Sequence, residues 1–387
     1  MKKKFVWLLA AVIVGAAVFC FSLNKSYKSD CSAMPAEALK LEKVSEYLYK
    51  IRYNDIDYSV INNWPELMEK AYKRISSVGS DKAFACTAVV NGSIYGRNLD
   101  FFIGQYPEFI VWVDGKEGRY ASMAVGSLLN VDRKEAESGK LSEDTIRLLP
   151  FMIFDGVNEK GVACNMNYVP RDVKHDSTNP KAEELPYFLV IRYVLDNAAS
   201  AAEGVELLKG RNLVDKPALS ALHWIIADPK ESYLVEIVDN ELRVVKNPKA
   251  MTNYYKSIDG YTPNACGIER MDIVNQNYDK ANTVEGMRSL LQSVHYTQSY
   301  KSSTKPFWYS EHYAYDALKG EDYTINTPKE KLQARVDKIV EDFSRCTRDN
   351  PDGFWETVHS SVYDLSKQTL RISMHEDYSK YWDFKLK

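Results

Sequence analysis

The sequence predicts an α+β fold in which antiparallel sheets and helices form separate layers. Segments with a strand pattern come in three blocks along the chain, and two blocks of helical periodicity separate them. Strands grouped with strands, and helices with helices, are typical of such layered bodies. With 387 residues the chain is long enough to bury a sizeable core, as one large domain or as two ordinary ones.

The first block of strands begins with a hairpin. The segment 84–90 is apolar and rich in residues that favour strands, and the dipeptide Asn91-Gly92 is a strong signal for a two-residue turn. A return strand over 93–97 follows, so the chain enters a sheet at Cys86. Apolar segments bounded by turns predict three more strands in this block, over 109–113, 120–125 and 162–168.

A spacing of apolar residues that is typical of helices takes over after this block. It predicts helices over 185–198 and 201–209, and Gly210 closes the second of them. The rest of the chain follows the same two patterns. It contains predicted strands over 222–227, 232–238, 241–245, 357–364 and 369–375, and predicted helices over 268–277, 284–294 and 329–345.

The amino terminus resembles an export signal or a membrane anchor. Three lysines at positions 2–4 precede an uncharged apolar run over 5–23. This run is close to the roughly 20 residues that span a bilayer. We therefore expect residues 1–24 to place the protein outside the cytoplasm, either secreted or held at a membrane by this segment. Whether the leader is cut stays open.

A segment of different composition lies between this leader and the hairpin. Residues 24–35 are polar and rich in turn formers, which indicates a linker. The next segment, 36–81, has the composition of a small attachment. It contains a predicted helix over 66–78, with Pro65 at its start and Gly79 at its end.

Charge and ligand patterns argue against several classes of protein. Lysine and arginine total 50 against 53 acidic residues, a net charge of -3 without blocks of like charge, so no nucleic-acid partner is expected. The six cysteines form no CxxC pair and the six histidines form no HExxH motif. Metal catalysis therefore gets no support, and we expect no cofactor. A disulfide such as Cys266 to Cys346 stays open.

Cys86 is the candidate reactive residue of the chain. A lone cysteine in an apolar strand is most often a buried small hydrophobe. Here the return strand carries Arg97 and Asp100, which lie toward the end of the hairpin where Cys86 stands. A buried arginine and a buried carboxylate beside a thiol either serve a function or form an ordinary ion pair of the sheet.

These residues, with others further along, resemble the choloylglycine hydrolase and acid ceramidase superfamily of N-terminal-nucleophile hydrolases. The matching segments come in family order and cover the chain from Cys86 to its carboxyl terminus. They are Cys86-Thr87 followed by Gly96-Arg97-Asn98 and Asp100, the run Asp-Gly-Val-Asn-Glu-Lys-Gly-Val over 155–162, the block at Leu222-His223-Trp224, Thr252-Asn253-Tyr254, and Glu269-Arg270-Met271.

The resemblance implies a four-layer αββα sandwich with antiparallel sheets over residues 86–387. It also implies hydrolysis of a linear amide C–N bond through Cys86, which autocatalytic cleavage after Ala85 would expose at a new amino terminus. A free α-amino group has a pKa near roughly 7.7 to 8.0, so it can act as general base for the thiol of the same residue. Residues 25–85 are then a linker and a pro-segment.

The resemblance also assigns roles by position. Arg97 would lower the pKa of the thiol, Asp100 would hold the α-amine, and Asn253 would donate its side-chain amide to the oxyanion. Arg270 would complete the polar network, whereas His223 is interpreted as a satisfied core histidine. The predicted catalytic set is Cys86, Arg97, Asp100, Tyr168, Asn253 and Arg270.

Two departures from the bile salt hydrolases leave the exact substrate open. Tyr168 stands where the bile salt hydrolases typically carry asparagine, and in this it resembles the penicillin V acylase-like members. Asn167 lies one residue away. The segment between Asn253 and Arg270 is short, as in the ceramidase and N-acylethanolamine amidase branch. We expect a small-molecule N-acyl amide with an apolar acyl group. The aromatic residues that either line its pocket or form sheet core are Phe101, Phe102, Tyr106, Phe109 and Trp112.

Two other functions are compatible with the sequence. In an acyltransferase, as in isopenicillin N acyltransferase-like relatives, an amine would replace water at the acyl-enzyme step. A surface-anchored lipid- or peptide-binding module would keep the fold without self-cleavage. A papain-like protease is disfavoured, because the Cys-Gly-Ser-Cys-Trp type of signature is absent around Cys86. The oligomeric state stays open.

Overall fold

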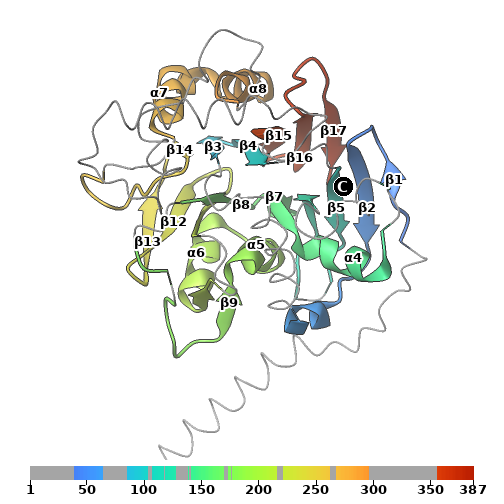
Figure 1. Cartoon of the computed structure of the whole chain (residues 1–387), viewed down its shortest axis with the longest axis horizontal. Helices are drawn as coiled ribbons and strands as arrows, with labels where there is room; N and C mark the ends of the chain where they lie inside the picture. The colour runs from blue at the N-terminus through green and yellow to red at the C-terminus, as the bar shows by residue number, and fades with distance from the viewer. Residues whose placement is uncertain are drawn as a thin grey trace, which may run out of the picture.

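A computed structural model describes the body of the protein (Figure 1). The described residues are 39–63, 85–102, 107–116, 118–127, 138, 141–169, 173–175, 177–215, 221–261, 267–295 and 355–387. The leader over 1–24, the helices predicted over 66–78 and 329–345, Tyr106, and the cysteines at 266 and 346 lie outside these ranges. Within them, no helix is long and apolar enough to cross a membrane.

Two sheets lie face to face at the centre of the molecule (Figure 1). The larger has nine strands, in the spatial order β1 (Glu42–Lys43), β2 (Leu48–Tyr53), β5 (Glu108–Val113), β6 (Ser122–Ser127), β7 (Ile153–Asn158), β8 (Ala163–Tyr168), β11 (Leu222–Ala227), β12 (Ser232–Val238) and β13 (Glu241–Lys246). The smaller has six, in the order β14 (Ala250–Met251), β3 (Ala85–Asn91), β4 (Ile94–Phe102), β15 (Trp355–Asp364), β16 (Thr369–Met374) and β17 (Trp382–Lys385).

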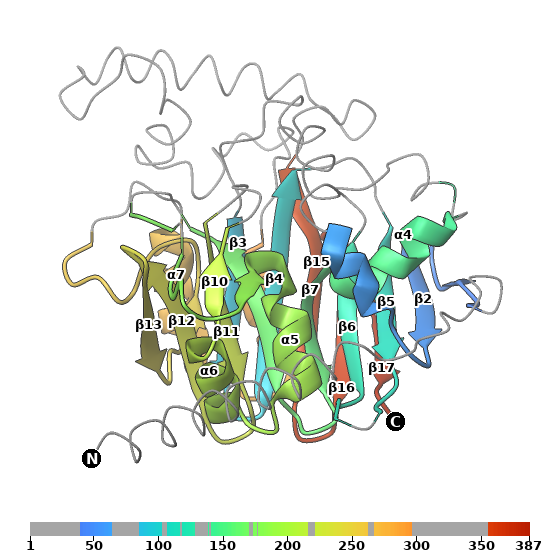
Figure 2. The same ribbon diagram turned by 90° about the horizontal axis from the view of Figure 1, so that it is seen from below.

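Helices cover the outer face of each sheet. α5 (Val190–Asn197) packs against β7 and β8, and α6 (Ala201–Lys209) packs against β11 and β12 (Figure 2). On the other side, α8 (Val284–Ser293) packs against β4 and β15, and α7 (Ile268–Asn277) packs against β14. The order of the layers is therefore αββα, which confirms the predicted fold class.

Shorter elements connect these layers. β9 (Glu184–Pro186) and β10 (Asn212–Val214) form a separate parallel pair. The remaining elements are α4 (Glu143–Leu148) and the 3-10 helices η2 (Tyr58–Asn63), η3 (Leu149–Phe151), η4 (Tyr187–Leu189) and η5 (Tyr278–Lys280).

Apolar side chains from both sheets fill the space between them. One core cluster joins Ala88 and Tyr95 of the smaller sheet to Ile110 of the larger. β5, β6, β7 and β11 are buried at every position, because other layers cover both of their faces. Such burial stabilises the fold by roughly 25 cal/mol per Å² of apolar surface. Among the polar exceptions, the carboxylates of Glu108 and Asp155 are also fully buried and need partners.

One strand departs from the predicted antiparallel arrangement. β2 runs parallel to β5, with Leu48 opposite Glu108 and Tyr53 opposite Val113. The other described strand pairs of the two sheets are antiparallel. A parallel neighbour requires a long connection. Here that connection passes through β3 and β4 of the other sheet before it returns to β5.

The described part of the segment with the composition of a small attachment, residues 39–63, thus contributes strands β1 and β2 to the larger sheet. Leu48, Ile51 and Tyr53 of β2 are buried in the core. Just beyond β2, Asp55 forms an ion pair with Arg119, which follows β5 in the chain. The described body therefore includes residues well before Cys86 that the sequence assigned to linker and pro-segment.

The turn of the first hairpin lies one residue later than predicted. Asn91 pairs with Ile94, so the two turn residues are Gly92 and Ser93. Gly92 has a φ of 61°, a conformation that glycine adopts without strain. Asn91 stays in the strand, and its side-chain amide donates to the carbonyl of Tyr278 at 2.9 Å.

The helix predicted over 185–198 begins only at Val190. Leu185 instead pairs with Leu213 in the parallel β9–β10 ladder, and Pro186 continues that strand. The long-range pairing overrides the local helical pattern. The other predicted elements within the described ranges start within two residues of their expected positions.

Replacing Ile51 tests whether β2 stabilises the whole sandwich. The Ile51 side chain is 2% exposed, so Ile51→Ala is expected to lower the free energy of unfolding by about 2 to 5 kcal/mol. Arg52→Ala is the matched control, because that side chain is 55% exposed and its loss should change stability by less than about 1 kcal/mol. Urea unfolding followed by tryptophan fluorescence measures both. Equally small effects would mean that the segment is merely attached.

Candidate active site

Cys86 lies at the second position of β3, almost wholly buried between the layers. In the β3–β4 register, Cys86 is opposite Leu99, Ala85 is opposite Asp100 and Ala88 is opposite Arg97. The hairpin therefore brings the two predicted polar residues to the thiol. Sγ lies 3.9 Å from Nη2 of Arg97 and 3.9 Å from the backbone oxygen of Asp100.

Arg97 is a buried cation that spans the two sheets. Its Nη1 donates to Oδ2 of Asp155 at 2.9 Å, and its Nη2 donates to the carbonyl of Met166 at 3.0 Å. Burial raises the pKa of the Cys86 thiol, whereas the charge of Arg97 opposes that rise. The predicted direction of the Arg97 effect is thus present, but burial is the stronger influence in the uncleaved chain.

Asp100 is incompletely satisfied. Its Oδ1 accepts a hydrogen bond from Oγ1 of Thr357 at 2.6 Å. Within the described part of the chain, the buried Oδ2 accepts no hydrogen bond, and Nη1 of Arg270 lies 3.7 Å away. Burial raises the pKa of Asp100 to about 7, although Arg270 and Thr357 act to lower it. An unsatisfied carboxylate oxygen at this depth is a place where a further donor would be stabilised.

Asn253 and Arg270 hold the backbone of Cys86. The backbone N–H of Cys86 donates to Oδ1 of Asn253 at 2.8 Å. Arg270 donates from Nη2 to the same Oδ1 and from Nη1 to the carbonyl of Cys86. Nη1 also donates to Oγ1 of Thr87 at 2.6 Å, a contact the sequence did not single out. Two predicted residues therefore converge on the cysteine through its main chain.

Tyr168 enters this arrangement through its main chain. Nδ2 of Asn253 donates to the carbonyl of Tyr168 at 2.9 Å. The neighbouring Asn167 points its amide at the carbonyls of Met251 and Thr252, both at 3.3 Å. The structure thus brings all six predicted residues together. The oxyanion role of Asn253 stays a prediction.

The buried His223 supports the loop that carries Asn253. Nε2 of His223 lies 2.9 Å from the carbonyl of Thr252, and Nδ1 lies 3.2 Å from Oε1 of Glu236. Glu236 also accepts from the backbone N–H groups of Lys256 and Ser257, at 2.9 and 2.8 Å. Both ring nitrogens are satisfied, which confirms His223 as a core histidine. Its contacts fix the ends of the loop.

The sequence did not single out β15 as part of the site. Thr357 contacts Asp100, and three further side chains of this strand, His359, Ser361 and Tyr363, contact Asp155. The available signal was the spacing, since side chains two residues apart in a strand lie on one face. Within the described ranges, no three His, Cys, Asp or Glu side chains are arranged to hold a metal ion.

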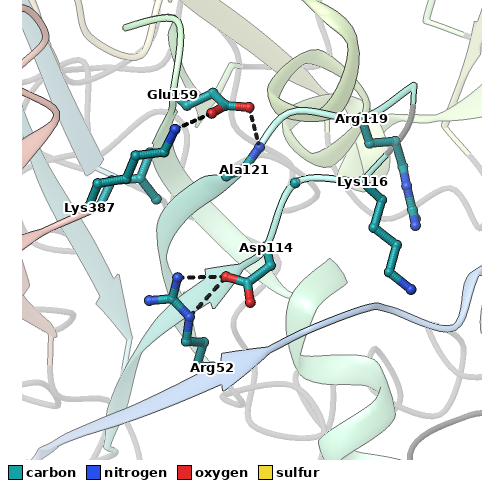
Figure 3. Close-up of a pocket in the computed structure, with 9 residues that line it drawn as sticks. Arg52, Asp114, Lys116, Arg119, Ala121, Glu159 and Lys387 are labelled. Carbon is teal, nitrogen blue, oxygen red and sulfur yellow. Dashed lines mark hydrogen bonds and ion pairs between the residues drawn. The ribbon is translucent and has the colours of Figure 1, made fainter.

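A surface pocket lies elsewhere (Figure 3). Its volume is about 550 Å³. It lies at the carboxyl ends of β2 and β5, close to the carboxyl terminus of the chain. Ion pairs of Arg52 with Asp114 and of Lys387 with Glu159 flank it (Figure 3). None of the six predicted catalytic residues lines this pocket. It is therefore separate from the cysteine site.

Comparison with known families finds a match that begins at the cysteine. Residues 86–257 match the model described as "Linear amide C-N hydrolases, choloylglycine hydrolase family", and the match begins at Cys86. The sequence of this region is therefore similar to that of the linear amide C–N hydrolases. Within that class, the region matches the choloylglycine hydrolase family over less than half of the chain.

Three relatives share sequence with parts of the chain. The chain is 25% identical over 210 residues to a bile salt hydrolase/transferase of Lactiplantibacillus plantarum, covering 49% of this chain and 62% of the relative. It is 30% identical over 117 residues to a bile salt hydrolase/transferase of Clostridium perfringens, covering 28% and 36%. It is 31% identical over 111 residues to a penicillin V acylase of Pectobacterium atrosepticum, covering 26% and 29%. Each match spans less than two thirds of the relative.

Solved structures of the same kinds of protein are similar at lower identity. A variant of the conjugated bile acid hydrolase from Clostridium perfringens has a TM-score of 0.44 at 18% identity, covering 78% of this chain and 92% of that one. The penicillin V acylase from Agrobacterium tumefaciens has a TM-score of 0.39 at 14% identity, covering 76% and 83%. The resemblance to the ceramidase branch stays a prediction from the sequence.

The buried carboxyl of Asp100 makes the uncleaved chain sensitive to pH. Its pKa in the folded chain, about 7, lies above its ordinary value because of burial. The stability that the protonated carboxyl contributes is therefore fully present below roughly pH 3.9, the ordinary aspartate pKa, and is lost as the pH rises through about 7.

We expect Asp100→Asn, in a Cys86→Ala background that removes the sulfur, to raise the free energy of unfolding at pH 8 by about 1 to 4 kcal/mol. The effect should be smaller at pH 5, by about a factor of three, and should vanish only below roughly pH 3.9. Asp155→Asn in the same background is the control with the opposite sign, because the pKa of Asp155 is lowered to about 2 despite its burial. Urea unfolding at both pH values decides. A destabilising Asp100→Asn at pH 8 would contradict the prediction.

Proposed function

We propose that this chain hydrolyses the C–N bond of linear N-acyl amides, with Cys86 as nucleophile once cleavage after Ala85 has freed its amino group. One observation carries the proposal: the family match begins at Cys86, the residue whose thiol contacts Arg97 and whose backbone Asn253 and Arg270 hold. A thiol becomes a nucleophile when a base takes its proton and a cation favours its thiolate.

Self-cleavage would use the thiol first. Sγ of Cys86 attacks the carbonyl carbon of Ala85 and the peptide C–N bond breaks. The acyl group forms a thioester, and the thiol proton passes to the departing nitrogen, which becomes the α-amino group. Water then hydrolyses the thioester to a carboxylate on Ala85 and a thiol on Cys86. The new amine would form at the bond after Ala85, the residue that pairs opposite Asp100, and Oδ2 of Asp100 needs a donor. An ammonium group there would lower the pKa of that carboxyl.

Turnover would use the same atoms with an external amide. The free amine takes the thiol proton, the thiolate attacks the substrate carbonyl, and the amine of the substrate leaves with that proton. One N–H of the Asn253 amide is engaged by the carbonyl of Tyr168, so we assign its second N–H to the oxyanion. Loss of one such donor typically slows the reaction by about 10² to 10³-fold. Water then releases the acyl group from sulfur.

The names of the relatives support a substrate class. They are bile salt hydrolases/transferases and a penicillin V acylase. We therefore propose small N-acyl amides with an apolar acyl group. Because two relatives are named hydrolase/transferase, acyl transfer to an amine is the second candidate. From the leader over 1–24 we further propose that the reaction takes place outside the cytoplasm, with the protein secreted or membrane-anchored.

Mass spectrometry and an activity screen test this function together. The purified chain should yield a fragment that begins at Cys86 and should release an amine from penicillin V, a conjugated bile salt or a long-chain N-acyl amine. Cys86→Ala should abolish cleavage and reduce turnover by at least about 10³-fold. Cys164→Ala is the matched control, because Cys164 is also a buried free thiol and lies outside the site. A full-length chain with an unreactive Cys86 would instead favour a binding module.

Cleavage after Ala85 is expected to leave both fragments in one particle. β2 shares backbone hydrogen bonds with β5, and Asp55 is paired with Lys116 and Arg119 across the cut. Purification through a tag at the carboxyl terminus should therefore recover the amino-terminal fragment in equal amount, as judged by intact mass. Recovery of the fragment from Cys86 alone under native conditions would contradict this prediction.

A further inference from the structure

His359 occupies a position in the site that the reaction outlined above does not use. It lies in β15, fully buried between the two sheets. A β-bulge precedes it, since Thr357 is opposite Asp100 whereas His359 is opposite Leu99. The bulge lets one strand reach both carboxylates of the site, Thr357 contacting Asp100 and His359 contacting Asp155.

Both ring nitrogens of His359 face carboxylates. Nδ1 lies 3.2 Å from Oε2 of Glu108, and Nε2 lies 3.0 Å from Oδ2 of Asp155. When Asp155 and Glu108 are both ionised, each only accepts hydrogen bonds, so both ring nitrogens donate and the ring is an imidazolium. Burial alone would lower the pKa of His359, but its hydrogen bonds and ion pairs with Asp155 and Glu108 raise it.

Asp155 connects this ring to the cysteine. Its Oδ2 accepts from Nε2 of His359 and from Nη1 of Arg97, and Nη2 of that arginine lies 3.9 Å from Sγ of Cys86. Burial alone would raise the pKa of Asp155, yet His359 and Arg97 lower it to about 2. Two cations therefore share one carboxylate oxygen, and one of them is the cation at the thiol.

The charges of this cluster balance only when the ring is protonated. Arg97 and His359 then offset Glu108 and Asp155. Without the imidazolium, two buried carboxylates would compete for the guanidinium and draw it away from the sulfur. The titratable and charged groups around His359 are Glu108 on β5, Asp155 on β7, Tyr95, Arg97 and Asp100 on β4, and Tyr363 on β15 itself.

We propose that His359 is a positioning residue of the cysteine site: its doubly protonated ring holds Asp155 so that Arg97 stays against the sulfur as counter-ion of the thiolate. This inference rests on the proposed role of Cys86 as nucleophile. It adds to the site a residue that touches neither substrate nor sulfur and acts through two others.

His359→Gln removes the charge while keeping a side chain that can donate a hydrogen bond. The rate at which iodoacetamide alkylates Cys86 in the full chain should follow a pH profile whose midpoint rises by about one unit. Below that midpoint, alkylation then slows about tenfold. Peptide mass spectrometry separates Cys86 from the other cysteines. The pH profile of kcat/KM on the best amide substrate should shift in the same direction.

His223→Gln is the matched control. It also removes a buried histidine paired with a glutamate, but that pair supports the loop that carries Asn253 and, within the described residues, forms no hydrogen bond or ion pair with the arginine at the thiol. The midpoint of Cys86 alkylation should stay at its wild-type value in this variant. If His359→Gln lowers turnover without moving the midpoint, His359 is only structural and the proposal is overturned.

A second measurement uses the wild-type chain, so its result does not depend on whether a variant folds. Nitrogen-15 NMR of the wild-type chain, labelled in its histidine rings, should show both nitrogens of His359 protonated at pH 8. A neutral ring at that pH overturns the proposal. Failure of the proposed function looks different: hydrolysis that survives Cys86→Ala rules out the nucleophile, while the alkylation profile still reports whether His359 acts on the thiol.

Discussion

The buried ion pair between Arg97 and Asp155 joins the two sheets at the point on which the candidate site depends. Moving two charges out of water costs several kcal/mol each, so a buried pair persists only where further groups satisfy the carboxylate. Here His359, Ser361 and Tyr363 all donate to Asp155. The pair therefore fixes how the smaller sheet lies over the larger one, and it does so beside the thiol. Packing and chemistry share one set of contacts.

Elements whose ends are set by neighbouring residues could be predicted from the sequence. α6 spans 201–209 as predicted, because the side chain of Ser200 accepts from the backbone of Glu203 and Gly210 follows the last turn. β2 could not be predicted in this way, since its partner β5 lies far along the chain and its parallel direction leaves no local signal. β7 was also missed, because it carries aspartate, glycine and asparagine, residues more typical of turns.

The members of the candidate site could be predicted, but only part of their geometry. The hairpin register places Arg97 near Cys86, and this follows from the strand pattern around the turn. The hydrogen bond from Asn253 to the main-chain carbonyl of Tyr168 could not be predicted from the strand pattern, because no side-chain pattern encodes a backbone contact. His359 could not be placed either. Its partners lie on two strands of the opposite sheet, so only the packed sandwich brings them together.

The placement of β2 has a consequence for the lifetime of the folded protein. This strand precedes β3 in the chain, yet it lies in the sheet beside β5, which follows β3. A cut between β2 and β3 would turn one polypeptide into two without altering the sandwich. Complete unfolding would then separate the two fragments. Their reassociation would be a second-order reaction, which becomes slower as the protein is diluted. The lifetime of the mature molecule would be governed by how slowly it opens rather than by a reversible equilibrium.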